Sequence, residues 1–158
     1  MLFEPIIELT IIIVADAGVP NQERVVLRPT ESVNLGQFGV TVGIRNSDNP
    51  NLILPLTDHF FWFPNLVVET PSWLFLYTGK GSYEETTRVG TSETAHVFHW
   101  GREITLFNYF ELVPVVFRHS AILIGPNPDR PTLESGLKLP PVAPMRPLAN
   151  LPRSRPEN

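Results

Sequence analysis

Short apolar runs separated by turn residues make up most of the chain. In residues 24–28, Val25 and Leu27 fall on one side of an extended backbone and the other three residues on the opposite side. Similar runs recur roughly every 8–12 residues, which is the spacing of strands in a sandwich or barrel. No apolar repeat of about 3.6 residues persists long enough to indicate a good helix. The pattern therefore predicts an all-β fold.

The same pattern predicts where the strands lie. The Ile-rich residues 6–14 indicate a strand that is buried on both faces or central in its sheet. Pro55 and Pro64 cannot donate to a ladder, so we expect them at strand ends or edges. Further strands are expected at residues 23–28, 38–44, 73–77, 95–100, 104–107, 111–117 and 121–124. A two-sheet core is expected from Val25, Leu27, Phe38, Trp73 or Leu74, Val97, Trp100, Val113 and Ile122.

The composition changes sharply after residue 125. Nine of the 17 prolines lie in residues 126–158, and a chain so rich in proline favours extended polyproline II over ladders or helices. We therefore divide the chain into a sandwich domain, residues 1–125, and a proline-rich extended or disordered arm, residues 126–158. Interspersed apolar side chains favour docking of this arm on a partner: Leu139, Val142, Met145 and Leu148.

Charge and cysteine content exclude some classes of function. Residues 1–125 carry a formal charge of −6 and residues 126–158 of +2, so the acidic body disfavours binding to a nucleic-acid backbone. A weaker possibility is nucleic-acid binding by the basic tail. The absence of cysteine excludes disulfides, thiolate metal sites and a Cys nucleophile. The apolar run at residues 11–14 is much shorter than the ~20 residues that span a bilayer, and no signal peptide is recognised, so we assign no compartment.

The stretch LYTGKGS at residues 76–82 is superficially similar to a phosphate-binding loop. Such a loop needs G-x-x-x-x-G-K-[ST] between a strand and a helix. Here Leu74 occupies the position of the first glycine, and Gly81 that of the hydroxyl residue. The polar residues that follow show no apolar helical face. We therefore predict a glycine-permitted turn after a strand, and no bound cofactor.

Histidines and carboxylates offer little support for an enzyme. His96 and His99 are three residues apart, so on one strand they face opposite ways and cannot bind one ion together. A metal would need His59 or Glu111 from another strand, and the spacing indicates no such site. We expect no catalytic, cofactor or metal residues. The alternative left open is a metal-dependent hydrolase, or another enzyme, with a site built from His59, His96, Glu111 and loop carboxylates. The loop carboxylates are Glu84, Glu85 and Glu93.

Aromatic residues are the most informative side chains. Residues 59–63 and 73–77 place large rings on both faces of their strands. One set can line a core, whereas the other needs cover from a neighbouring strand, the arm or a second subunit. Trp62, Trp73 and Tyr77, with the four apolar arm residues named above, are therefore the candidate interaction surface.

The motifs also occur in a recognisable order. The chain contains ERVVLRP, VNLGQFGVTVG, FWFPN, LFLYTGKG, HVFHWG and ELVPVVFRHSAILIG in succession. Over residues 6–125 this order resembles the lamin-tail domain family, in its bacterial type. The resemblance implies an immunoglobulin-like, antiparallel two-sheet β-sandwich without catalytic residues. It also implies a binding or tethering module, whose partner would be another protein or a second copy of the chain.

Overall fold

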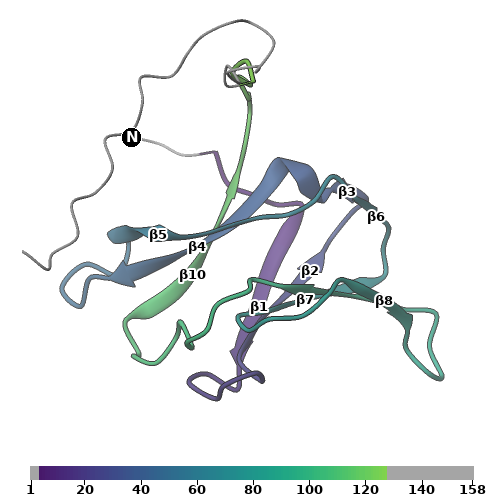
Figure 1. Cartoon of the computed structure of the whole chain (residues 1–158), viewed down its shortest axis with the longest axis horizontal. Coiled ribbons are helices and arrows are strands. Elements are labelled where there is room, and N and C mark those ends of the chain that lie inside the picture. The colour runs from purple at the N-terminus through teal and green to yellow at the C-terminus, as the bar shows by residue number, and fades with distance from the viewer. Residues whose placement is uncertain (1–3, 128–158) are drawn as a thin grey trace, which may run out of the picture. The chain divides into compact units, whose positions relative to one another are not determined.

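The computed structural model describes residues 4–127 (Figure 1). A compact unit of the chain ends at Ile122, and a second unit begins at Leu123. The four arm residues of the predicted interaction surface, residues 139, 142, 145 and 148, lie outside the described residues.

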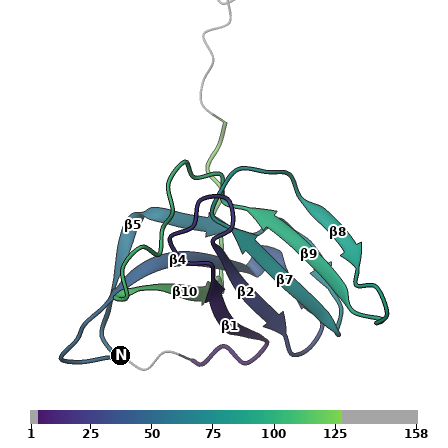
Figure 2. The ribbon, with the colours of Figure 1, turned by 90° about the horizontal axis from the view of Figure 1, so that it is seen from below.

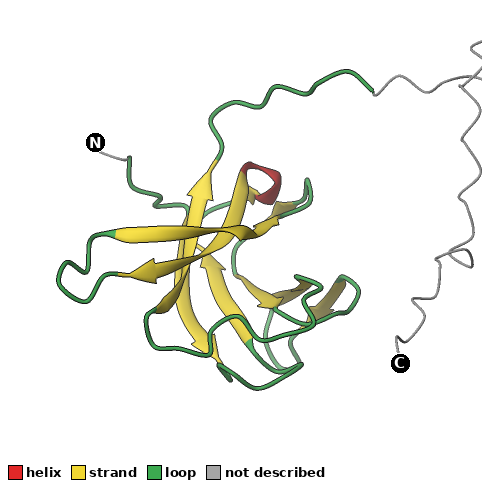
Figure 3. Cartoon of the chain, turned by 60° about the vertical axis from the view of Figure 1, so that its left-hand side comes forward, coloured by secondary structure: helices red, strands yellow, loops and turns green. Residues whose placement is uncertain are grey.

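The described residues form strands and one short 3-10 helix, η1, at Leu35–Gln37 (Figure 3). The strands are β1 (Leu9–Ala15), β2 (Arg24–Pro29), β3 (Val33–Asn34), β4 (Phe38–Arg45), β5 (Ile53–Trp62), β6 (Val67–Val68), β7 (Ser72–Tyr77), β8 (Glu84–Thr87), β9 (Thr94–His99) and β10 (Leu112–Arg118). The prediction of an all-β fold is confirmed.

Two larger sheets make up a β-sandwich (Figure 2). One has the strand order β1-β2-β7-β9-β8 and the other the order β10-β4-β5, while β3 and β6 form a small third sheet. All pairs are antiparallel except β7 and β9, which run parallel. This exception arises because the chain passes from β7 to the sheet edge, forms β8 there, and returns as β9 into the position between them.

The core lies between the two larger sheets and follows from strict alternation. Val25 and Leu27 of β2 are fully buried, and Val40 and Val42 of β4 meet them from the other sheet as members of the same cluster. The predicted core residues that the structure confirms are Val25, Leu27, Phe38, Leu74 and Trp100. The prediction was wrong for the other three. Val97 and Val113 lie outside the core cluster, because neighbouring residues of their strands point inward instead. Ile122 is 55% exposed.

Three predicted elements differ in the structure. The Ile-rich strand β1 is an edge strand, not a central one, and Ile12 and Ile13 are about half exposed. Residues 104–107 form no strand, because the N–H groups of Leu106 and Phe107 donate to the buried carboxylate of Glu23 instead of a ladder. Residues 121–124 are also outside any strand.

Strand β8 was not predicted. Its sequence, EETT, is wholly polar and was expected to be a solvated loop. All four residues are exposed, and β8 pairs with β9 at the edge of the five-stranded sheet. A polar edge strand stays in place through its backbone ladder and carries no apolar pattern that sequence reasoning could detect.

Candidate functional site

The predicted aromatic residues lie on two different surfaces. Trp62 is on β5, on the outer face of the three-stranded sheet. Trp73 and Tyr77 are on β7, where Leu74 and Leu76 point into the core and the aromatic rings therefore point outward. The structure thus divides the predicted surface between the two outer faces of the sandwich.

The outer face of the five-stranded sheet is covered by its own charged side chains. The Arg28 guanidinium lies 4.6 Å from the centre of the Trp73 ring, and that of Arg24 lies 5.5 Å from the centre of the Tyr77 ring. Both are cation–π contacts, and the arginine stems also shield the apolar surface between the rings. Trp73 and Tyr77 are consequently half-buried.

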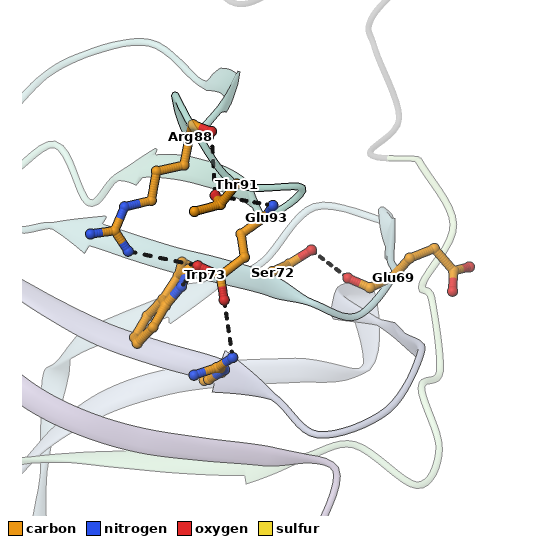
Figure 4. A network of polar contacts seen from close by, with 7 residues as sticks. Glu69, Ser72, Trp73, Arg88, Thr91 and Glu93 are labelled. Carbon is orange, nitrogen blue, oxygen red and sulfur yellow. Dashed lines mark hydrogen bonds and ion pairs between the residues drawn. The ribbon is translucent and has the colours of Figure 1, made fainter.

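Glu93 holds the Arg28 side of this cover in place (Figure 4), whereas Arg24 pairs with Asp16. Its carboxylate accepts a hydrogen bond of 3.1 Å from the Trp73 indole and pairs with Arg28 at 3.2 Å and Arg88 at 3.6 Å. From the sequence, Glu93 was one of the loop carboxylates of the alternative enzyme site. The structure instead engages it with two cations and an indole on the protein itself.

The outer face of the three-stranded sheet is open and aromatic. We call the cluster of Phe60, Trp62, Phe117 and His119 the aromatic face. Phe60 and Phe117 stack with their ring centres 4.8 Å apart, although they lie on the two edge strands β5 and β10. His119 lies 5.1 Å from Phe117, edge to face, and 4.8 Å from Trp62. The rings therefore form one continuous surface across the sheet.

Gly39 on the central strand β4 makes this stacking possible. A Cβ atom at this position would lie 2.6 Å from Cζ of Phe117 and 2.7 Å from Cε2 of Phe60. The two rings can meet above β4 only because position 39 has no side chain. Gly39 thus has a packing role inside a strand.

Within residues 4–127, no arginine or lysine makes a cation–π contact with the aromatic face. Phe60 is 42% exposed and Trp62 is 45% exposed. Among these residues, neither takes part in a cation–π contact. The Trp62 indole donates to the carbonyl oxygen of Gly36 at 2.7 Å, so its polar group is satisfied while the ring stays accessible. Phe60 and Trp62 are thus the accessible part of the aromatic face, whereas Phe117 and His119 are half-buried.

Sequence reasoning identified Trp62 but missed Phe117 and His119. Phe117 was expected only as the last residue of the strand at residues 111–117, and His119 lies just beyond it. They join the aromatic face because β10 pairs with β4 in a register that places Phe117 opposite Gly39. This register is set by pairing between distant segments, so no local pattern in the sequence could reveal it.

The TGKG motif is a turn after β7, as predicted, and it leads into strand β8. The N–H of Thr78 donates to the carbonyl oxygen of Glu23 at 3.1 Å. Gly81 lies against the His99 ring, and a Cβ atom there would be 2.3 Å from that ring. The second glycine therefore has a packing explanation that involves no phosphate.

His96 and His99 lie on opposite faces of β9, as predicted. His99 stacks on Tyr77 with ring centres 5.4 Å apart, whereas His96 is 5% exposed and its Nδ1 lies 2.9 Å from the Tyr83 hydroxyl. Burial lowers the pKa of His96, and the nearby Glu85 carboxylate opposes that effect. Burial, together with Glu85, raises the pKa of Tyr83.

In the part of the chain that the structure describes, no group of three or more His, Asp or Glu side chains is placed to hold a metal ion. None of its helices is both long and apolar enough to cross a membrane. In comparisons with known proteins, no family model, no curated protein and no solved structure matches the chain.

Proposed function

We propose that the chain is a non-enzymatic binding or tethering module of the lamin-tail type, and that the aromatic face is its binding surface. One observation carries the proposal: both outer faces of the sandwich bear aromatic rings, yet cations stack on the rings of only one of them. Arg24 and Arg28 lie over Tyr77 and Trp73 of the five-stranded sheet, and within residues 4–127 no cation–π contact involves a ring of the three-stranded sheet.

The chemistry of the aromatic face suits a protein partner. Trp is enriched among the residues that dominate binding energies, especially where an apolar ring is fully desolvated by the partner. The Phe60, Phe117 and His119 rings already support one another, so little side-chain freedom is lost on binding. The partner would present an apolar surface, on another protein or on a second copy of the chain.

We further propose that the proline-rich arm contributes to the same role. Leu139, Val142, Met145 and Leu148 give it apolar side chains at intervals, and a chain rich in proline loses little entropy on docking. The sequence alone supports this part of the proposal.

Capture of partners by variants of the full chain tests the proposal. Tagged wild type, the double variant Phe60→Ser/Trp62→Ser and the control Phe110→Ser would each be used on native cell extract, with bound proteins identified by mass spectrometry. Phe110 is 94% exposed in a loop, so it is an exposed aromatic residue like Phe60 but lies outside the aromatic face. We expect the double variant to lose a partner that the control retains, by about tenfold or more in affinity once that partner is purified.

Equal capture by the two variants contradicts the proposal for the aromatic face. A truncation that ends at Gly125 separates the contribution of the arm, because a partner lost only on truncation binds through residues 126–158.

A further inference from the structure

A groove of about 920 Å³ follows the free edges of β1 and β10, which are terminal strands of the two sheets. Consecutive residues line it from both strands, residues 9–11 on one side and residues 114–118 on the other. Neighbouring residues of a strand point to opposite faces, so a groove lined by consecutive residues runs along the strand edges themselves. The groove therefore gives access to backbone N–H and C=O groups that an added strand could pair with.

Most residues that line the groove are apolar, and charged side chains lie at one end of it. Ile6, Leu9, Ile11 and Val116 are among its lining residues. At the charged end, Arg118 pairs with both Glu4, at 2.9 Å, and Glu8. With its charges paired to one another, the groove suits an extended apolar segment better than a charged one.

The chain contains a segment of this kind. Residues 121–124, Ala-Ile-Leu-Ile, combine branched and large apolar side chains and were expected to form a strand. In the structure they belong to none, and Ile122, Leu123 and Ile124 are 55%, 98% and 87% exposed. Four extended residues span about 13 Å and the five lining residues of β10 about 17 Å, so the segment fits within the groove.

The connection between β10 and this segment decides which copy supplies it. The His119 N–H still donates to the Gln37 carbonyl oxygen at 2.7 Å, so at His119 the chain continues in the direction of β10. Only Ser120 then separates it from residue 121, whereas a tight hairpin needs about two loop residues to reverse the chain. A segment from another chain is not subject to this restriction.

We propose that residues 121–124 of a second copy occupy the groove, as a strand added between the edges of β1 and β10. The apolar side chains of the segment are thereby buried, and the free edges of both sheets gain a hydrogen-bonding partner. This self-association uses the groove, which shares only Phe117 with the aromatic face that carries the proposed function.

Disulfide trapping tests the contact, because the chain has no cysteine of its own. Full-length chains with Thr10→Cys, in the groove, and Leu123→Cys, in the segment, would be given tags of different size, mixed and oxidised mildly. The control replaces Leu123→Cys by Val89→Cys, which is 99% exposed near β8. We expect at least tenfold more mixed disulfide dimer from the first pair; equal yields overturn the proposal.

Sedimentation velocity over a range of concentrations gives a second, independent test. We expect the wild type to self-associate and Ile122→Lys/Ile124→Lys to remain a monomer. The matched variant Val89→Lys/Ile104→Lys also adds two lysines at exposed apolar positions and should behave as the wild type. A wild type that stays monomeric up to about millimolar concentration overturns the proposal. Neither Phe60 nor Trp62 lines the groove, so Phe60→Ser/Trp62→Ser should still self-associate, and the failure of either proposal is recognisable separately.

Discussion

At the scale of single residues, His96 illustrates how position controls chemistry. It lies on the inner side of β9, buried, with the Tyr83 hydroxyl 2.9 Å from Nδ1 and the Glu85 carboxylate 3.9 Å away. Burial disfavours the charged imidazolium more than Glu85 favours it, so the pKa of His96 falls below its ordinary value of 6.5. The sequence showed His96 as a possible metal ligand; its surroundings make it a buried neutral side chain.

The lowered pKa of His96 predicts a loss of stability in mild acid. Above about pH 6.5 the imidazole is neutral in both the folded and the unfolded chain. Below that pH, His96 is protonated in the unfolded chain, whereas in the folded protein it is protonated only at a lower pH because its pKa is lower. Acid therefore favours the unfolded state. We expect Tm to fall from about pH 7.5 to about pH 5.5, and to fall less in His96→Gln. An unchanged slope in the variant would assign the effect to another group.

At the scale of elements, the three-stranded sheet depends on a missing side chain. Rings from β5 and β10 meet across β4 above Gly39, and the same position lies close to the backbone of β5. Besides its backbone hydrogen bonds, the sheet is therefore stabilised by an aromatic pair that joins its two outer strands across the central one.

Gly39→Ala should therefore destabilise the sandwich. The new Cβ atom would lie 2.6 Å from Phe117, 2.7 Å from Phe60 and 2.9 Å from the carbonyl oxygen of Phe61, so both rings and backbone must move. We expect a loss of about 2 kcal/mol in the free energy of unfolding, measured by urea denaturation. Gly125→Ala is the control, since no atom lies within 4 Å of its Cβ position. Equal free energies of unfolding for the two variants would contradict this, because they would mean that the rings of Phe60 and Phe117 can move aside without loss of stability.

At the scale of the whole molecule, one carboxylate connects segments that are far apart in the sequence. Glu23 is fully buried and accepts hydrogen bonds from the N–H groups of Gly18 at 2.7 Å, Leu106 at 2.6 Å and Phe107 at 3.1 Å. It thereby joins the β1–β2 connection of one sheet to the loop that leads into β10 of the other. This loop was expected to be a strand, and the carboxylate explains why it is not.

Glu23→Ala should cost about 3 kcal/mol in the free energy of unfolding, because it leaves buried N–H groups without an acceptor. Glu23→Gln keeps one acceptor oxygen and should cost less. Glu31→Ala, at an exposed position, is expected to stay within about 0.5 kcal/mol of the wild type. Urea denaturation compares the three variants, and a Glu23→Ala variant as stable as Glu31→Ala would refute this role.

Local patterns in the sequence predicted the strands whose side chains alternate, such as β2 and β7, and the turn at TGKG. They failed where long-range contacts decide the structure. The apolar residues of β1 suggested a central strand, although only pairing can show that β1 lies at an edge. Likewise Trp62 was identified by its ring, whereas Phe117 joined it through the register of β10 against β4. Sequence therefore predicted which side chains could bind, and topology determined which of them remain open.

The strand order has a consequence for synthesis of the chain on the ribosome. The last strand of the five-stranded sheet in the sequence is β9, so this sheet can form before β10 is synthesised. The three-stranded sheet needs β10 and is completed later. At ~5–20 residues per second, several seconds separate the emergence of β4 from that of β10. During this interval the apolar side chains of β4 and β5 have no closing strand, and nascent chains stalled before residue 112 would be natural clients of chaperones.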